Sequence, residues 1–189
     1  MRIIAGKLRG RRLHAVGSAP LRPTSDRLRE TLFDIVGAAR PLEGTVWLDL
    51  FAGTGAVGIE ALSRGAAKVY FVESARGSLA LLRKNLAALE ISEGQAEVIP
   101  LKALDALRRL AKQAEQRSCD IAFLDPPYDE EQQYRLILEA LADSGLLKSN
   151  SIAIAEHSKR FDPPAKVARL ERYRVLKQGD AALSFYRPA

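Results

Sequence analysis

The sequence predicts an α/β fold built on a mostly parallel sheet. From residue 45 onward, short apolar runs alternate with amphipathic helical patterns, which is typical of parallel βαβ units. The chain then closes on two strand-like runs, 168–176 and 182–187, around Gly179-Asp180, a hairpin signal. Its 189 residues suit a single domain with one core. We therefore expect a seven-stranded, Rossmann-like sheet that ends in an antiparallel C-terminal hairpin.

A small basic β-hairpin extension is expected at residues 1–22, ahead of a main domain at 23–189. Residues 2–5 and 11–14 have strand character, and Gly6 and Gly10 stand at the two ends of the turn between them. The extension is therefore expected to fold locally.

The main domain is expected to open with a helix that has Thr24 as its N-cap and Gly37 at its C-terminus. The five parallel strands are then predicted at 46–50, 68–73, 96–100, 120–125 and 151–155. The helices that follow the first four strands are predicted to end near Arg64 and to span 76–89, 103–115 and 131–142. Trp47 and Cys119 are expected in the core.

The net charge of +6 is concentrated in one segment. Residues 1–30 contain eight basic and two acidic residues, which accounts for all of it, so the remaining chain sums to zero. Such asymmetry favours a nucleic-acid binder over a merely solvated basic surface. We predict RNA contacts at Lys7, Arg9, Arg11, Arg12, Arg22, Arg27 and Arg29. An exposed, salt-bridged helix face is the other interpretation of Arg27 and Arg29.

Several classes of protein are disfavoured by composition. No apolar run approaches the roughly 20 residues that span a bilayer. The basic N-terminus has no apolar segment of a secretory signal. One cysteine and two histidines offer neither a disulfide nor metal-ligand spacing. We expect a cytoplasmic monomer without a metal, and we expect His14 and His157 to be surface or structural residues.

A glycine loop follows the first predicted parallel strand. Gly53 and Gly55 allow a sharp turn and a close approach of backbone to ligand, and Gly58 would let the following helix pack close to the sheet. Glu73 ends the next strand and could hold the hydroxyls of an adenosine ribose. The spacing alone also fits a dinucleotide. Asp49 favours S-adenosylmethionine, because a carboxylate there attracts a cationic methionine group and repels a pyrophosphate.

The tetrapeptide Asp125-Pro126-Pro127-Tyr128 follows the fourth predicted parallel strand, at the same edge of the sheet as the glycine loop. An exocyclic base amine is a poor nucleophile, because its lone pair is delocalised into the ring. The Asp125 carboxylate and the Pro126 carbonyl could accept its two N–H groups, and Tyr128 could stack on the base. These four residues are the predicted catalytic set, for methyl transfer to a conjugated amine.

With these motifs the chain resembles the RsmD family of bacterial 16S ribosomal RNA (guanine-N2)-methyltransferases. The resemblance runs over nearly the whole chain, and its most specific stretch is Arg22–Phe33. It implies a guanine N2 target in 16S rRNA, within the small ribosomal subunit or an assembly intermediate. With the neighbouring loop residues it gives a predicted S-adenosylmethionine site of Asp49, Phe51, Ala52, Gly53, Thr54, Gly55, Glu73, Ser74, Lys102 and Ala103.

Lys102 departs from the family pattern. Such methyltransferases often carry Asp or Asn after the third strand, contacting the adenine amine. A lysine cannot accept that hydrogen bond, so backbone groups would have to recognise adenine here. The sequence leaves three other functions open: an adenine-N6 methyltransferase acting on DNA or RNA, a nicotinamide-dependent oxidoreductase, and a catalytically silent RNA-binding module.

Overall fold

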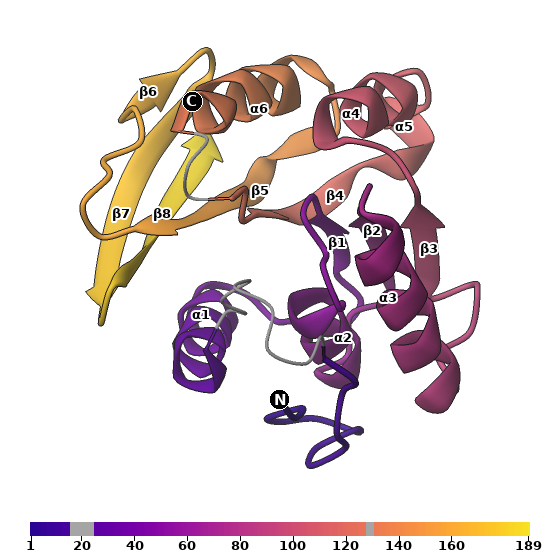
Figure 1. Ribbon diagram of the computed structural model, residues 1–189. Coiled ribbons are helices and arrows are strands. Elements are labelled where there is room, and N and C mark those ends of the chain that lie inside the picture. The colour runs from indigo at the N-terminus through magenta and orange to yellow at the C-terminus, as the bar shows by residue number, and fades with distance from the viewer. Residues whose placement is uncertain (16–24, 128–130) are drawn as a thin grey trace. The chain divides into compact units, whose positions relative to one another are not determined.

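The computed structural model describes residues 1–15, 25–127 and 131–189, which divide between two compact units, Met1–Pro100 and Leu101–Ala189 (Figure 1). Three residues named above, Arg22, Thr24 and Tyr128, lie outside the described residues. Each unit is described by itself.

The first unit contains a three-stranded parallel sheet in the order β3-β2-β1. The strands are β1 (Val46–Asp49), β2 (Lys68–Val72) and β3 (Ala96–Ile99). After their first residues, β1 and β2 are buried throughout, as expected for strands covered on both faces. The helices are α1 (Asp26–Ala39), α2 (Ala56–Ser63), which packs on β1 and β2, and α3 (Arg76–Ala88). The predicted βαβ pattern is confirmed.

Helix α1 begins and ends differently from the expectation. Its N-cap is Ser25, one residue after the predicted Thr24, and the Ser25 side chain accepts a hydrogen bond from the Leu28 N–H at 3.1 Å. Gly37 lies inside the helix rather than closing it, since the helix continues to Ala39. The predicted cap and terminus were therefore wrong by one and by two residues.

The N-terminal arm, residues 1–15, forms the predicted turn but little regular strand. A single antiparallel bridge joins Arg2 and Arg12. Next to it, the Ile3 N–H donates to the Arg11 carbonyl, and the Ile3 carbonyl accepts a hydrogen bond from the Gly10 N–H. Gly6 and Gly10 have φ of +81° and +82°, which glycine adopts without strain. A Cβ on Gly6 would lie 1.8 Å from the Ser63 carbonyl oxygen, so the arm approaches α2 too closely for any side chain there.

The second unit contains a mixed sheet of five strands in the order β4-β5-β8-β7-β6. They are β4 (Cys119–Leu124), β5 (Leu147–Ser158), β6 (Lys166–Val167), β7 (Leu170–Gln178) and β8 (Ala181–Pro188). β4 and β5 are parallel, and the other neighbours pair antiparallel. The hairpin of β7 and β8 confirms the predicted C-terminal hairpin, with Gly179 in its turn at φ +63°.

The strands and helices of the second unit also differ from the expectation in length and number. β5 extends past the apolar core run to His157 and Ser158, because buried polar groups there find partners: the His157 Nε2 lies 2.9 Å from the Ser184 Oγ of β8. The short β6 brings the described strands of the two units to eight, where seven were expected. The helix predicted at 103–115 is two helices. The helices are α4 (Ala103–Ala111), α5 (Ala114–Arg117) and α6 (Glu131–Asp143).

The predicted core residues are buried. Trp47 stacks on Phe33 with ring centroids 5.1 Å apart, and its Nε1–H donates to the Thr45 Oγ1 at 3.0 Å. Cys119 is buried in β4. Within the described residues, no helix is long and apolar enough to span a membrane, and no group of three or more potential metal ligands occurs.

Candidate active site

The glycine loop follows β1 and leads directly into α2. The Ala52 N–H donates to the Val72 carbonyl at 2.9 Å, which holds the loop against the end of β2. Gly55 is the N-cap residue of α2 with φ of +87°, and Gly53 has φ of +53°. Both are left-handed conformations that favour glycine. The loop therefore has the tight backbone expected of a segment that a ligand approaches closely.

Gly58 explains how α2 comes so near the sheet. A Cβ on Gly58 would lie 2.3 Å from Cε1 of Phe71 and 2.8 Å from Cγ1 of Val69. Both side chains belong to β2. The prediction that Gly58 permits close packing of helix on sheet is confirmed.

Asp49 is the last residue of β1, and only one of the two oxygens of its buried carboxylate accepts a hydrogen bond from a described residue. Its Oδ2 accepts a hydrogen bond from the Gly58 N–H at 3.2 Å. Among the residues that the structure describes, no group donates a hydrogen bond to its Oδ1, although that atom is buried. Burial raises the pKa of Asp49 to about 7, and the charge of Glu73 adds to the effect while the Gly58 hydrogen bond opposes it.

Glu73, which directly follows β2, also contacts the glycine loop. One carboxylate oxygen accepts the Gly53 N–H at 2.9 Å, and the other accepts the N–H groups of Ser74 and Ala75, each at 2.7 Å. The structure thus brings Asp49, Gly53, Glu73 and Ser74 to one loop at the carboxyl ends of β1 and β2. A cationic ligand group suits this pair of carboxylates, because it would stabilise the ionised form of Asp49.

The other part of the predicted site belongs to the second unit. Asp125 and Pro126 directly follow β4, with Pro126 buried and Asp125 half-buried. The hydroxyl of Tyr134, a buried residue of α6, donates to the Glu156 carbonyl at 2.9 Å and also contacts the Pro126 carbonyl at 3.5 Å. The Tyr134 hydroxyl therefore lies against the predicted amine acceptor, with its one proton donated to Glu156. Pro127 is exposed.

The turn at 102–103 begins α4. Lys102 is exposed and is the N-cap residue without a side-chain hydrogen bond to the helix, while Ala103 is buried. Asp105, one turn further on, forms an exposed ion pair with Arg108 at 3.3 Å. Its carboxylate is therefore engaged on the helix surface.

The predicted RNA contacts differ in their exposure. The side chains of Lys7, Arg9, Arg11, Arg12 and Arg27 are exposed. The Arg11 guanidinium also donates to the Ala88 carbonyl at the end of α3 at 2.9 Å. Arg29 is a correction, because its side chain has 0% exposure and can neither reach a phosphate nor form an exposed helix face.

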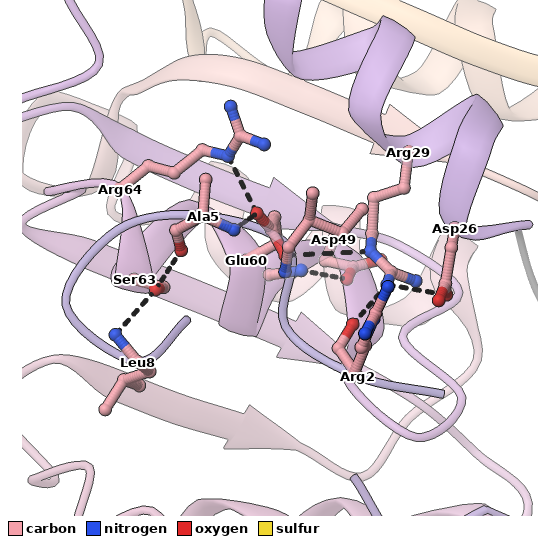
Figure 2. A network of polar contacts seen from close by, with 11 residues as sticks. Arg2, Ala5, Leu8, Asp26, Arg29, Asp49, Glu60, Ser63 and Arg64 are labelled. Carbon is pink, nitrogen blue, oxygen red and sulfur yellow. Dashed lines mark hydrogen bonds and ion pairs between the residues drawn. The ribbon is translucent and has the colours of Figure 1, made fainter. Parts of the chain in front are cut away.

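Arg29 belongs instead to a buried polar network that anchors the N-terminal arm (Figure 2). It donates to the Arg2 carbonyl at 2.6 Å and lies 3.8 Å from the carboxylate of Glu60 in α2. The two Glu60 oxygens accept the N–H groups of Ile4 and Ala5 at 2.8 and 3.0 Å. Arg64 completes the network with an ion pair to Glu60 at 2.8 Å. The basic arm is thus part of the first unit's packing.

Comparison with known proteins places the chain in a family. The family model described as "Conserved hypothetical protein 95" matches residues 1–187. Ribosomal RNA small subunit methyltransferase D of Haemophilus influenzae is 38% identical over 187 residues, which cover 99% of this chain and 92% of the relative. The chain belongs to the RsmD family. The resemblance drawn from the sequence motifs is confirmed.

Solved structures agree with the RsmD assignment. The yhhF structure from Escherichia coli aligns with a TM-score of 0.80 at 34% identity, over 100% of this chain and 97% of that one. The SAM-dependent methyltransferase from Agrobacterium tumefaciens has the same fold with a TM-score of 0.64 at 17% identity, over 89% of this chain and 63% of that one. The predicted fold class, a Rossmann-like methyltransferase sheet with a C-terminal antiparallel hairpin, is confirmed.

Three residues near these motifs were missed by sequence reasoning. Glu60 carried a signal, as the lone charge in a helix whose other residues are all small or apolar. Asn85 carried another, since it shares the buried face of α3 with Leu79, Leu82 and Leu86. Tyr134 had none, because a tyrosine on the apolar face of a helix is ordinary.

Proposed function

We propose that this RsmD-family protein transfers a methyl group from S-adenosylmethionine to the N2 amine of a guanine in 16S rRNA of the small ribosomal subunit. The observation that carries the proposal is Asp49, a buried carboxylate at the glycine loop with a pKa of about 7 and an oxygen to which no described residue donates a hydrogen bond. A pyrophosphate would raise the energy of that carboxylate further, whereas an ammonium or sulfonium group lowers it. A nicotinamide cofactor is disfavoured for this reason.

The residues of the glycine loop have distinct roles in this proposal. S-adenosylmethionine supplies an electrophilic methyl group on a positively charged sulfur. Asp49 balances the positive charge of the methionine portion, and Glu73 accepts hydrogen bonds from the ribose hydroxyls. Gly53 keeps a side chain out of the open space beside the loop, so that the backbone itself forms the wall of the site, whereas Gly55 lets the loop pack against Leu82, whose Cδ1 would lie 2.5 Å from a Cβ there.

Asp125 and Pro126 act on the other substrate. The Asp125 carboxylate accepts one N–H of the target amine and the Pro126 carbonyl accepts the second. This arrangement directs the nitrogen lone pair away from the conjugated ring and toward the methyl donor. As the new N–C bond forms, the bond between the methyl group and sulfur would break and S-adenosylhomocysteine would leave, while the nitrogen becomes acidic and releases a proton to Asp125 or to water. Tyr128 is proposed to stack on the base.

The N-terminal arm is proposed to hold the RNA. Lys7, Arg9 and Arg12 present exposed positive charge on a loop anchored by the buried Glu60 network. Phosphate contacts of this kind position a polyanion without reading its sequence. The small-subunit substrate is supported by the name of the Haemophilus influenzae relative, ribosomal RNA small subunit methyltransferase D.

Methyl transfer from tritiated S-adenosylmethionine tests the proposal. The substrates are small subunits and naked 16S rRNA from a strain lacking this gene, with double-stranded DNA in parallel, followed by mass-spectrometric mapping of the labelled nucleotide. We expect label on guanine N2 of small-subunit RNA. Label on adenine, or on DNA alone, would establish the adenine-N6 alternative instead.

Asp125→Ala provides the matched control. It should abolish transfer while calorimetric affinity for S-adenosylmethionine stays within about twofold of the parent. An equal loss of affinity would mean that Asp125 serves the cofactor rather than the amine. Binding of NAD without binding of S-adenosylmethionine would reject the methyltransferase assignment altogether.

A further inference from the structure

The side chain of Asn85 joins the N-terminal arm to the glycine loop. Asn85 lies in α3 with 1% of its surface exposed. Its Oδ1 accepts the His14 N–H at 2.7 Å, and its Nδ2 donates to the His14 carbonyl at 3.0 Å. The second proton of Nδ2 is donated to the Thr54 carbonyl at 2.9 Å. One buried amide thus binds two backbone segments that are 40 residues apart in the sequence.

The chemistry of these three contacts is specific to an amide. The Asn85 side chain pairs with both backbone groups of His14, as a neighbouring strand would. A leucine of similar size offers no hydrogen bonds, and an aspartate offers no donor for the two carbonyls. Loss of either donor would leave a buried carbonyl without its partner. The position therefore needs an asparagine for its hydrogen bonds as well as its volume.

The two segments that meet at Asn85 have different proposed ligands. Thr54 lies between Gly53 and Gly55 in the loop proposed for the cofactor. His14 closes the arm two residues after Arg12, on the segment proposed for RNA. Anything that orders the backbone at one of these segments also orders the amide that holds the other.

We propose that Asn85 is a positioning residue that couples RNA binding on the N-terminal arm to cofactor binding at the glycine loop. The inference rests on the proposed function, since it assumes that both ligands bind. The Asn85 contacts hold both segments in one arrangement, so a ligand that stabilises this arrangement at one segment also favours it at the other. Coupling of this kind is reciprocal: RNA tightens cofactor binding by the same factor by which the cofactor tightens RNA binding.

The test measures the affinity of the full chain for S-adenosylhomocysteine by calorimetry, with and without a saturating single-stranded RNA oligonucleotide from 16S rRNA, at fixed salt. We expect the RNA to tighten S-adenosylhomocysteine binding at least threefold in the parent. In Asn85→Ala the ratio should fall to near one. RNA affinity without cofactor should stay within about twofold of the parent.

His14 provides a matched pair of variants at an exposed position. His14→Pro removes the backbone N–H that Asn85 accepts, whereas His14→Ala keeps it and loses only the imidazole. We expect His14→Ala to retain the parent's coupling and His14→Pro to lose it. If Asn85→Ala does not fold, this pair still tests the coupling, because Asn85 itself is unchanged in both His14 variants.

Three outcomes would overturn the inference: a ratio of one in the parent, absence of RNA binding to the parent, or parental coupling in folded His14→Pro. Methyl transfer to small subunits is measured separately on the parent. Transfer without coupling would reject the role of Asn85 alone, and coupling without transfer would reject the proposed function alone.

Discussion

Asp49 and Gly58 are joined by a 3.2 Å hydrogen bond that ties the end of β1 to the first turn of α2. The bond satisfies Oδ2, while Oδ1 is buried with no donor among the described residues. When it is ionised, the carboxylate consequently lowers the stability of the folded chain. For the same reason, the ionised carboxylate should bind a cation strongly.

The first prediction concerns Asp49→Asn. The pKa of Asp49 is about 7 in the folded chain against 3.8 for an ordinary aspartate, so the folded state binds the proton more tightly. Ionisation therefore lowers the free energy of unfolding as pH rises from about 4 to about 7, by up to about 4 kcal/mol. The neutral asparagine avoids this loss. We expect its Tm to exceed the parent's above pH 7, and the difference to vanish near pH 4.

Asp49→Asn should also weaken S-adenosylmethionine binding at least tenfold by calorimetry, while binding to the parent should tighten as pH rises toward 7. Asp34→Asn, at an exposed position of α1, is the control and should leave both stability and affinity unchanged. A destabilised Asp49→Asn at pH 8 would contradict the burial cost assigned to the carboxylate.

The second prediction concerns Glu60→Gln. The two oxygens of Glu60 accept the N–H groups of Ile4 and Ala5, but a glutamine has one oxygen and must turn its NH₂ toward one of these donors. It also leaves the buried Arg29 without a facing carboxylate at this position. We expect a loss of about 3–5 kcal/mol in the free energy of unfolding by denaturant titration. Faster proteolysis of the N-terminal arm should accompany it.

Glu139→Gln removes a comparable but exposed ion pair, the 2.8 Å contact with Arg135 in α6. Such pairs contribute below about 1 kcal/mol, so this variant should resemble the parent. Equal effects of the two substitutions would show that burial of the Glu60 network has no energetic consequence.

The third prediction concerns Tyr134→Phe. Removing the hydroxyl leaves the buried Glu156 carbonyl without that donor and removes the group that lies against the Pro126 carbonyl. The free energy of unfolding should fall by about 1–2 kcal/mol. Because Pro126 is a proposed amine acceptor, kcat for methyl transfer should fall several-fold while the KM for S-adenosylmethionine is unchanged.

Tyr186→Phe is matched to this change, since the Tyr186 hydroxyl donates to the Pro164 carbonyl at 3.0 Å. It should lose similar stability and keep its kcat. A parallel loss of kcat in both variants would indicate a general effect of destabilisation rather than a role for Tyr134 at Pro126.

The fourth prediction concerns the charge of the arm. Arg9→Glu combined with Arg12→Glu removes two proposed phosphate contacts at exposed positions. RNA affinity should fall, and the slope of log affinity against log salt should lose about 1.4 for a single strand. The double variant Arg109→Glu with Lys112→Glu makes the same change of net charge on α4. An equal change of slope there would assign the effect to net charge alone.

The order and type of elements could be predicted because parallel strands with apolar runs alternate with helices in this chain. The boundaries were less predictable where a short polar side chain decides them. Ser25 caps α1 although Thr24 is equally suited by type, and β5 runs on to His157 because β8 pairs with it there, with Ala182 opposite His157 and the His157 ring hydrogen-bonded to the Ser184 hydroxyl. Neither partner is visible without the fold.

Charge in the sequence does not distinguish an anchor from a ligand contact. Arg29 and Arg27 stand two residues apart on α1, yet one is fully buried against Arg2 and Glu60 and the other is exposed. The tight backbone of the glycine loop was predictable because left-handed conformations restrict residue type, whereas the catalytic role of the tetrapeptide stays a prediction. Asn85 was not predictable, because its value lies in three contacts with segments remote in sequence.

The Glu60 network also bears on the order of folding. The arm precedes the side chains that bind its backbone, because Glu60 and Ser63 follow it by more than 50 residues and Asn85 comes later still. Such contacts form only after a long loop has closed, which slows them. Until α2 and α3 have been synthesised, the proposed RNA-binding residues lack the contacts that hold the arm in place. The arm is therefore among the segments that must wait longest for their native contacts.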